Sequence, residues 1–324
     1  MTFDEAVQQI NAARSFADLA PAGEPGLAYK MLVKIVHPDA APAGRSASAT
    51  AAFARLSALW AGRADRVLTT THGSYRIGAL VESGDIADLY EVDGDAALLK
   101  LPRLPSDNDL TAAEARALST LERDGEARHR AYAPRLIESF THEDPATRVR
   151  RTANVLARQR GFVSLAEVAR AHPQGVDPRD AAWMWRRLLV GLGWAHRAGI
   201  VHGAVLPEHI LIHPAEHGLV LIDWCYSTVP GGRIPALVGR YRDDYPSEVP
   251  AKQEATPATD IFLATRTMRR LISSRLPAPM RRFADGCLYD APRMRPQDAW
   301  KLLAEFDELI ESLFGPRKFR PFTV

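Results

Sequence analysis

The sequence predicts an α+β protein in which a small all-helical domain precedes a larger part with two lobes. Three observations carry this prediction. Apolar residues recur at helical spacing through residues 1–61. From Tyr75 the pattern changes to short apolar runs that are typical of strands. Beyond residue 178, helical stripes return and continue to a closing helix at 296–313.

Length and composition fit a soluble globular protein. The chain has 324 residues, enough for about two domains. It is 46% hydrophobic and 25% charged, and its net charge of +2 favours neither nucleic acid nor membrane as a partner. The two cysteines lack a metal-type spacing, which fits a reducing compartment. We find no signal-peptide pattern and no apolar run of spanning length, so we expect a cytoplasmic protein.

Three apolar stripes predict the helices of the first domain, residues 1–61. Each stripe has the spacing of one helix face. Their members are Phe3, Ala6, Ile10 and Ala13; then Ala28, Met31, Leu32 and Ile35; then Ala52, Phe53, Leu56, Leu59 and Trp60. Residues 62–74 carry polar residues and glycine without such a stripe, so we read them as a linker.

The tripeptide His37-Pro38-Asp39 follows the second stripe, which carries Lys30 and Lys34. Pro38 would end that helix, because proline lacks the N–H and restricts the residue before it. A basic helix, this tripeptide and a following helix resemble the J-domain of co-chaperones. The resemblance implies that the turn stimulates a partner heat-shock chaperone ATPase on which the basic helix docks. The alternative is a simple helix stop.

Strand-like runs at 75–81, 86–92 and 96–102 lead into a helical stretch at 110–122. Lys100 lies on the third run and Glu114 on the helix. This order resembles the small lobe of protein kinases, in which a strand lysine paired with a helix glutamate contacts the α- and β-phosphates of ATP. The alternative for Lys100 is a solvated charge on an edge strand.

Only one glycine remains where kinases carry a glycine-rich phosphate loop. Aligned on Tyr90, the three glycine positions hold Glu82, Gly84 and Ala87, with Asp85 between them. Added carboxylates near a triphosphate repel it. An ordinary hairpin turn is the alternative interpretation. We therefore expect the binding of ATP and Mg²⁺ to be weak or absent.

The segment from His202 to Leu211 has the frame of the kinase catalytic loop, H-R-D-L-K-P-x-N, without its reactive groups. Ala204 stands at the position of the aspartate that accepts the proton of the substrate, and His209 at the position of the metal-binding asparagine. His209 is either a polar loop residue or a substitute metal ligand or base. No catalytic residue is assigned on this pattern.

Asp223-Trp224-Cys225 stands where kinases carry D-F-G, after a hairpin predicted at 210–212 and 219–222. The resemblance implies that Asp223 holds Mg²⁺, and the alternative is that it caps a turn. Glu248 and Arg295 match a glutamate and an arginine that form a buried pair in the kinase scaffold.

The kinase resemblance spans about residues 75–313. It implies a small lobe at 75–158, a large lobe at 159–315 and a tail at 316–324 that is loose or docks as a short peptide. The sequence thus predicts a pseudokinase that acts as a binding or regulatory scaffold for a protein client, with a J-like module. The alternative is an ATP-dependent phosphoryl or nucleotidyl transferase with an atypical catalytic loop.

Overall fold

The computed structural model describes residues 1–20, 25–38, 41–42, 44–62, 66–94, 96–144 and 148–324. The chain forms two compact units: residues 1–81 with 90–94, and residues 82–89 with 95–324. The boundary passes through strands β2 (Ser74–Ser83) and β3 (Ala87–Val92), so each strand contributes residues to both units.

The first unit contains the three predicted helices, α1 (Phe3–Ala12), α2 (Pro25–Val36) and α3 (Ser46–Gly62). Thr2 and Glu5 cap the start of α1, each side chain accepting a hydrogen bond from the other residue's backbone N–H. Arg55 of α3 donates to the carbonyl oxygens of Ile10 and Ala13, at 2.8 and 2.9 Å. This side chain therefore satisfies carbonyl groups that the end of α1 leaves open.

Most residues of the apolar stripes form the core of this unit or pack against it. Ile10, Leu32, Val36 and Leu56 are almost fully buried. Met31, which the pattern placed on the buried face of α2, is 53% exposed, because α2 turns Leu32 and Val36 inward instead.

Part of the predicted linker is a strand. Residues Arg66–Thr69 form β1, which pairs antiparallel with β2. The Thr70 hydroxyl closes the turn between the strands, accepting from the N–H of Gly73 at 3.2 Å and donating to its carbonyl. Val67 and Leu68 favour a strand, but two apolar residues are too few to show a periodic pattern in the sequence.

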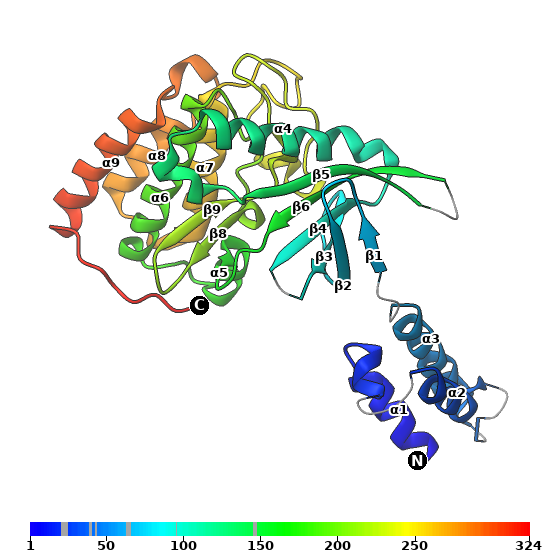
Figure 1. The fold of residues 1–324 in the computed structure, drawn as a ribbon. Coiled ribbons are helices and arrows are strands. Elements are labelled where there is room, and N and C mark those ends of the chain that lie inside the picture. Colours follow the sequence, from blue (N-terminus) through cyan, green and yellow to red (C-terminus); the bar gives the residue numbers. More distant parts are fainter. Residues whose placement is uncertain (21–24, 39–40, 43, 63–65, 95, 145–147) are drawn as a thin grey trace. The chain divides into compact units, whose positions relative to one another are not determined.

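A curled antiparallel sheet follows, whose later strands belong to the second unit, as does the helix α4 (Asn108–Asp124) that crosses it in Figure 1. The strand order of the whole sheet is β1-β2-β3-β4-β6-β5, with β4 (Ala97–Pro102), β5 (Leu136–Glu143) and β6 (Arg150–Ala157). β5 had no counterpart among the predicted strands. A register shift between Leu136 and Glu138 interrupts its alternation, which hides it in the sequence.

The remainder of this unit is mainly helical, with a small sheet of order β7-β8-β9. Its elements are β7 (Val163–Ser164), α5 (Leu165–Ala171), α6 (Pro178–Arg197), β8 (Ile210–His213), β9 (Gly218–Leu221), α7 (Pro257–Ile272), α8 (Ala278–Cys287) and α9 (Ala299–Phe314). The predicted stripe of α6, with Trp185 and Leu188 at its centre, is fully buried.

The C-terminal tail lies against the helical part of its own unit. Phe322 is buried, with its ring centroid 5.6 Å from that of His172. Arg320 lies 3.5 and 3.6 Å from carboxylate oxygens of Asp177 and Asp180. The described tail is thus packed on its own unit.

N-terminal helices, a curled antiparallel sheet and a helical C-terminal part follow one another in the predicted order. This α+β architecture is consistent with a kinase-like fold. Among the described residues, no helix combines the length and the apolar character needed to cross a membrane.

Candidate functional site

Four charged side chains from four segments of the second unit meet in one buried cluster. Lys100 comes from β4, Glu114 from α4, His209 from the short helical turn Pro207–His209, and Asp223 from the segment after β9. Glu114 is fully buried, and Lys100 and His209 are nearly so. Sequence reasoning had singled out all four, and the fold brings them together.

The predicted pair of Lys100 and Glu114 is present. The Lys100 ammonium donates to Glu114 Oε1 at 3.0 Å and also to Asp223. Burial alone would lower the pKa of Lys100, but the carboxylates of Asp223 and Glu114 raise it well above its ordinary value. Lys100 is therefore a fixed positive charge shared by two carboxylates.

Asn154 completes this pair, a role that sequence reasoning missed. It lies on β6 directly opposite Lys100, and its side-chain amide donates to Glu114 Oε2 at 3.0 Å. Its only sequence signal is a polar residue within the apolar run of a buried strand. The amide thus binds the oxygen of Glu114 that Lys100 does not contact.

His209 binds the second oxygen of Asp223. Its Nε2 lies 3.0 Å from Asp223 Oδ2, and its Nδ1 lies 2.9 Å from the carbonyl oxygen of Ala204. A carbonyl and a carboxylate only accept hydrogen bonds, so both ring nitrogens act as donors. A histidine that donates from both nitrogens is an imidazolium cation.

The electrostatics of the cluster agree with this charge state. Burial alone would lower the pKa of His209, but Asp223 and the Ala204 carbonyl raise it above its ordinary value. Burial would raise the pKa of Asp223, but Lys100 and His209 hold it well below its usual range. Two cations thus face two carboxylates, and the cluster is neutralised from within the chain.

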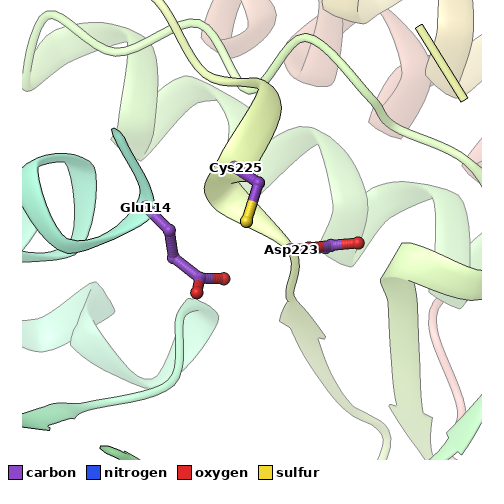
Figure 2. Close-up of side chains that lie close together, drawn as sticks. All are labelled: Glu114, Asp223 and Cys225. Atoms are coloured by element: carbon purple, nitrogen blue, oxygen red, sulfur yellow. The ribbon is translucent and has the colours of Figure 1, made fainter. Parts of the chain in front are cut away.

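Glu114, Asp223 and Cys225 have potential ligand atoms within 4.8 Å of one another, and Figure 2 shows these three side chains. Burial raises the pKa of the Cys225 thiol well above its ordinary value, so the thiol stays neutral. Lys100 already donates to both carboxylates, and the imidazolium of His209 lies beside Asp223. Mg²⁺ binds to proteins through one or two carboxylates, and both carboxylates here are already engaged by cations of the chain. The residues present therefore do not fit Mg²⁺.

The catalytic-loop segment keeps its scaffold. Asp260 of α7 accepts from the backbone N–H groups of His202 and Gly203, at 2.7 and 2.8 Å. Gly203 has φ +78°, and a Cβ atom built on it would overlap the carbonyl oxygen of Tyr226. Ala204 is fully buried and carries no ionisable group. The loop is held in place with alanine at the position of the carboxylate that accepts the substrate proton in kinases.

The segment around Gly84 is a hairpin turn between β2 and β3. The Gly84 N–H donates to the Ala87 carbonyl at 2.9 Å, so it is not directed at a ligand. Arg103 donates to the Ser83 hydroxyl at 2.9 Å and to the carbonyl oxygens of Gly84 and Asp85. The side chain of Arg103 thus binds backbone carbonyl groups of the turn.

Arg240 links this turn to the catalytic-loop segment. Its guanidinium lies 3.5 Å from a carboxylate oxygen of Asp85 and 3.6 Å from one of Glu208. Tyr241 donates its hydroxyl proton to Glu208. This bridge could not be predicted from the sequence, because Asp85 lies more than a hundred residues before Glu208 and Arg240.

The remaining predicted site residues lie in the first unit. Lys30 and Lys34 are both exposed on α2. α2 ends at Val36, directly before His37 and Pro38. The His37 ring packs edge-on against Phe53 of α3, with centroids 5.4 Å apart. Asp39 lies outside the described residues.

The predicted scaffold pair is confirmed. Arg295 donates to both oxygens of Glu248, at 2.6 and 3.1 Å, and both side chains are buried. The Thr259 hydroxyl donates to Glu248 at 3.1 Å. The guanidinium also lies over the Phe262 ring, 4.6 Å from its centroid. This pair fixes the segment before α7 to the region before α9.

Fold and site together are consistent with a protein that contains a protein-kinase-like region. A scan against protein-family models found no model that matches the chain. Casein kinase II subunit alpha' of Saccharomyces cerevisiae is 40% identical over 45 residues, which cover 14% of this chain. The match spans only 13% of the length of that protein. It indicates a distant kinase similarity, and no comparison supports the J-domain resemblance.

Proposed function

We propose that the second unit is a pseudokinase, a kinase-like module that binds a protein partner and does not transfer phosphate. The contact between His209 and Asp223 carries the proposal. In an active kinase this aspartate binds Mg²⁺, which bridges the phosphates. Here an imidazolium takes one of its oxygens and Lys100 the other. A cation that belongs to the chain stands where the metal would be needed.

The neighbouring segments support the same proposal. Ala204 offers no group that could accept a proton from a substrate hydroxyl. The N–H of Gly84, the one glycine at the three phosphate-loop positions, is bonded within its own turn. Arg240 joins Asp85 of that turn to Glu208 of the catalytic-loop segment. Each feature opposes nucleotide binding or transfer, and none of them disturbs the fold.

A thermal-shift titration with ATP, with and without Mg²⁺, tests this function. We expect no Mg²⁺-dependent rise in the melting temperature of the wild type, because a ligand stabilises only the folded state that it binds. The variant His209→Asn replaces the imidazolium with an oxygen ligand, so we expect it to gain such a rise. Asp223→Ala is the control in which any such rise must vanish.

The alternative function makes the opposite prediction. A rise in the wild type that disappears in Asp223→Ala, together with transfer of label from radioactive ATP that Lys100→Ala abolishes, would replace the pseudokinase proposal with that of a phosphoryl or nucleotidyl transferase. His209 would then act as a metal ligand or base in that reaction.

We further propose that the first unit recruits a heat-shock chaperone ATPase. Lys30 and Lys34 are four residues apart on α2, so they share one exposed face directly before His37. The whole chain is expected to raise the ATPase rate of such a chaperone, and His37→Gln to lose the effect. His72→Gln, at an exposed histidine of the same unit, is the matched control. An unchanged rate with the whole chain would refute recruitment.

A further inference from the structure

A concave site lies in the second unit, apart from the Lys100 cluster. It is a pocket of about 620 Å³ between α6, the end of α9 and the C-terminal tail. Figure 1 shows these three segments, with the tail in red. The volume falls within the range of ~300 to 1,000 Å³ that is typical of small-molecule sites.

The ionisable side chains that line this pocket are all basic. They are Arg179, Arg186, Arg187, His217, Arg317, Lys318 and Arg320. Carboxylates pair with three of them. Asp307 pairs with Arg186 at 2.8 Å and with Arg317 at 3.4 Å, while Arg320 faces Asp177 and Asp180.

Burial lowers the pKa of His217 below its ordinary value, and the other three cations remain without a carboxylate. Within the part of the chain that the structure describes, no acidic side chain pairs with Arg179, Arg187 or Lys318. Arg187 donates to the Tyr132 hydroxyl at 3.4 Å, and Arg179 lies over the Phe314 ring, 5.5 Å from its centroid. All three are exposed. Arg179 and Arg187 are eight residues apart, which places them on the same face of α6.

The same pocket has an aromatic wall. Trp183 lies on α6 between the two arginines, and its ring stacks on His217 with centroids 4.0 Å apart. The ring centroid of Phe319 in the tail lies 4.4 Å from that of His217, and Phe319 is 65% exposed. A small inorganic ion has no apolar part that could pack on these surfaces.

We propose that this pocket binds a small phosphate monoester with an apolar body. Guanidinium groups match the geometry of phosphate oxygens, and a dianion would offset the local excess of positive charge. The flat rings of Trp183 and Phe319 would take the apolar part of the ligand. The site shares no residue with the Lys100 cluster, so it does not depend on the proposed function.

Isothermal titration of the full chain with 1-naphthyl phosphate tests the proposal. Inorganic phosphate and 1-naphthol are the two partial ligands, and we expect each to bind at least tenfold more weakly. Arg187→Gln and Lys318→Gln should each weaken 1-naphthyl phosphate about tenfold, the usual effect of losing a hydrogen bond to a charged group. Arg282→Gln on α8 makes the same charge change at an exposed site outside the pocket and should leave the affinity unchanged.

Several results would overturn the proposal. Absence of binding by 1-naphthyl phosphate refutes it outright. Equal affinity for inorganic phosphate would show an ion site, and equal affinity for 1-naphthoate would show that phosphate is not selected. Equal weakening by Arg282→Gln would show only diffuse attraction to a basic surface. The protein could also sediment with phosphatidic acid vesicles and lose this binding in Arg187→Gln. That result would assign the ester to a lipid headgroup instead of a soluble molecule.

Discussion

Replacing Arg295 with methionine is expected to lower the free energy of unfolding by about 3 to 5 kcal/mol, the usual cost of removing one partner of a buried ion pair. Glu248 is 1% exposed, so the substitution would leave its carboxylate buried with the Thr259 hydroxyl as a remaining partner. The carbonyl groups of Tyr289 and Asp290 would lose their donor as well. Urea unfolding at neutral pH measures this change.

An exposed pair of the same chemistry provides the control for this experiment. Arg269 and Asp285 form an ion pair at 2.9 Å whose side chains are 39% and 57% exposed. Because water screens such pairs, Arg269→Met should cost no more than about 1 kcal/mol. Equal losses in the two variants would show that the Glu248 pair does not depend on its burial.

Replacing Lys100 with methionine is expected to destabilise the protein by a similar amount, about 3 to 5 kcal/mol. Glu114 is fully buried, and without the ammonium its charge would be left with the amide of Asn154 alone. Asp223 would keep only His209. Chemical unfolding of the apo protein measures the loss, so the result does not depend on nucleotide.

Two further variants sharpen this prediction. Lys100→Met combined with Glu114→Gln should recover part of the lost stability, because the glutamine oxygen can still accept from Asn154 while the buried charge is gone. Lys301→Met, at an exposed position on α9, should change the free energy of unfolding by no more than about 0.5 kcal/mol. A Lys100→Met variant as stable as the wild type would contradict the structural role of the cluster.

The long helices could be predicted from the sequence because their signals are local. α6 is capped by Asp177, whose side chain accepts from the N–H of Arg179, and has proline in its first turn. Asp298 caps α9 in the same way. β1 and β5 were missed because they are short or irregular and take their stability from partner strands.

The candidate site likewise contains residues with a local sequence signal and residues without one. Lys100, Glu114 and Asp223 could be named because each stands within a motif that has a fixed order. The charge of His209 could not, because it depends on the carbonyl of Ala204 and the carboxylate of Asp223 lying on opposite sides of one ring. Asn154 and Arg240 act across distant parts of the chain, and contacts of that kind leave no periodic pattern.

The backbone at Gly203 limits any attempt to engineer a transferase from this loop. Its positive φ and the nearby Tyr226 carbonyl leave no space for a side chain, so the arginine of the kinase pattern cannot be installed at this position as the loop stands. Changing Ala204 to aspartate would add a carboxylate to a loop whose preceding residue must stay glycine. A designer who wanted the arginine of the kinase pattern at this position would have to rebuild the path of the main chain first and choose the side chain afterwards.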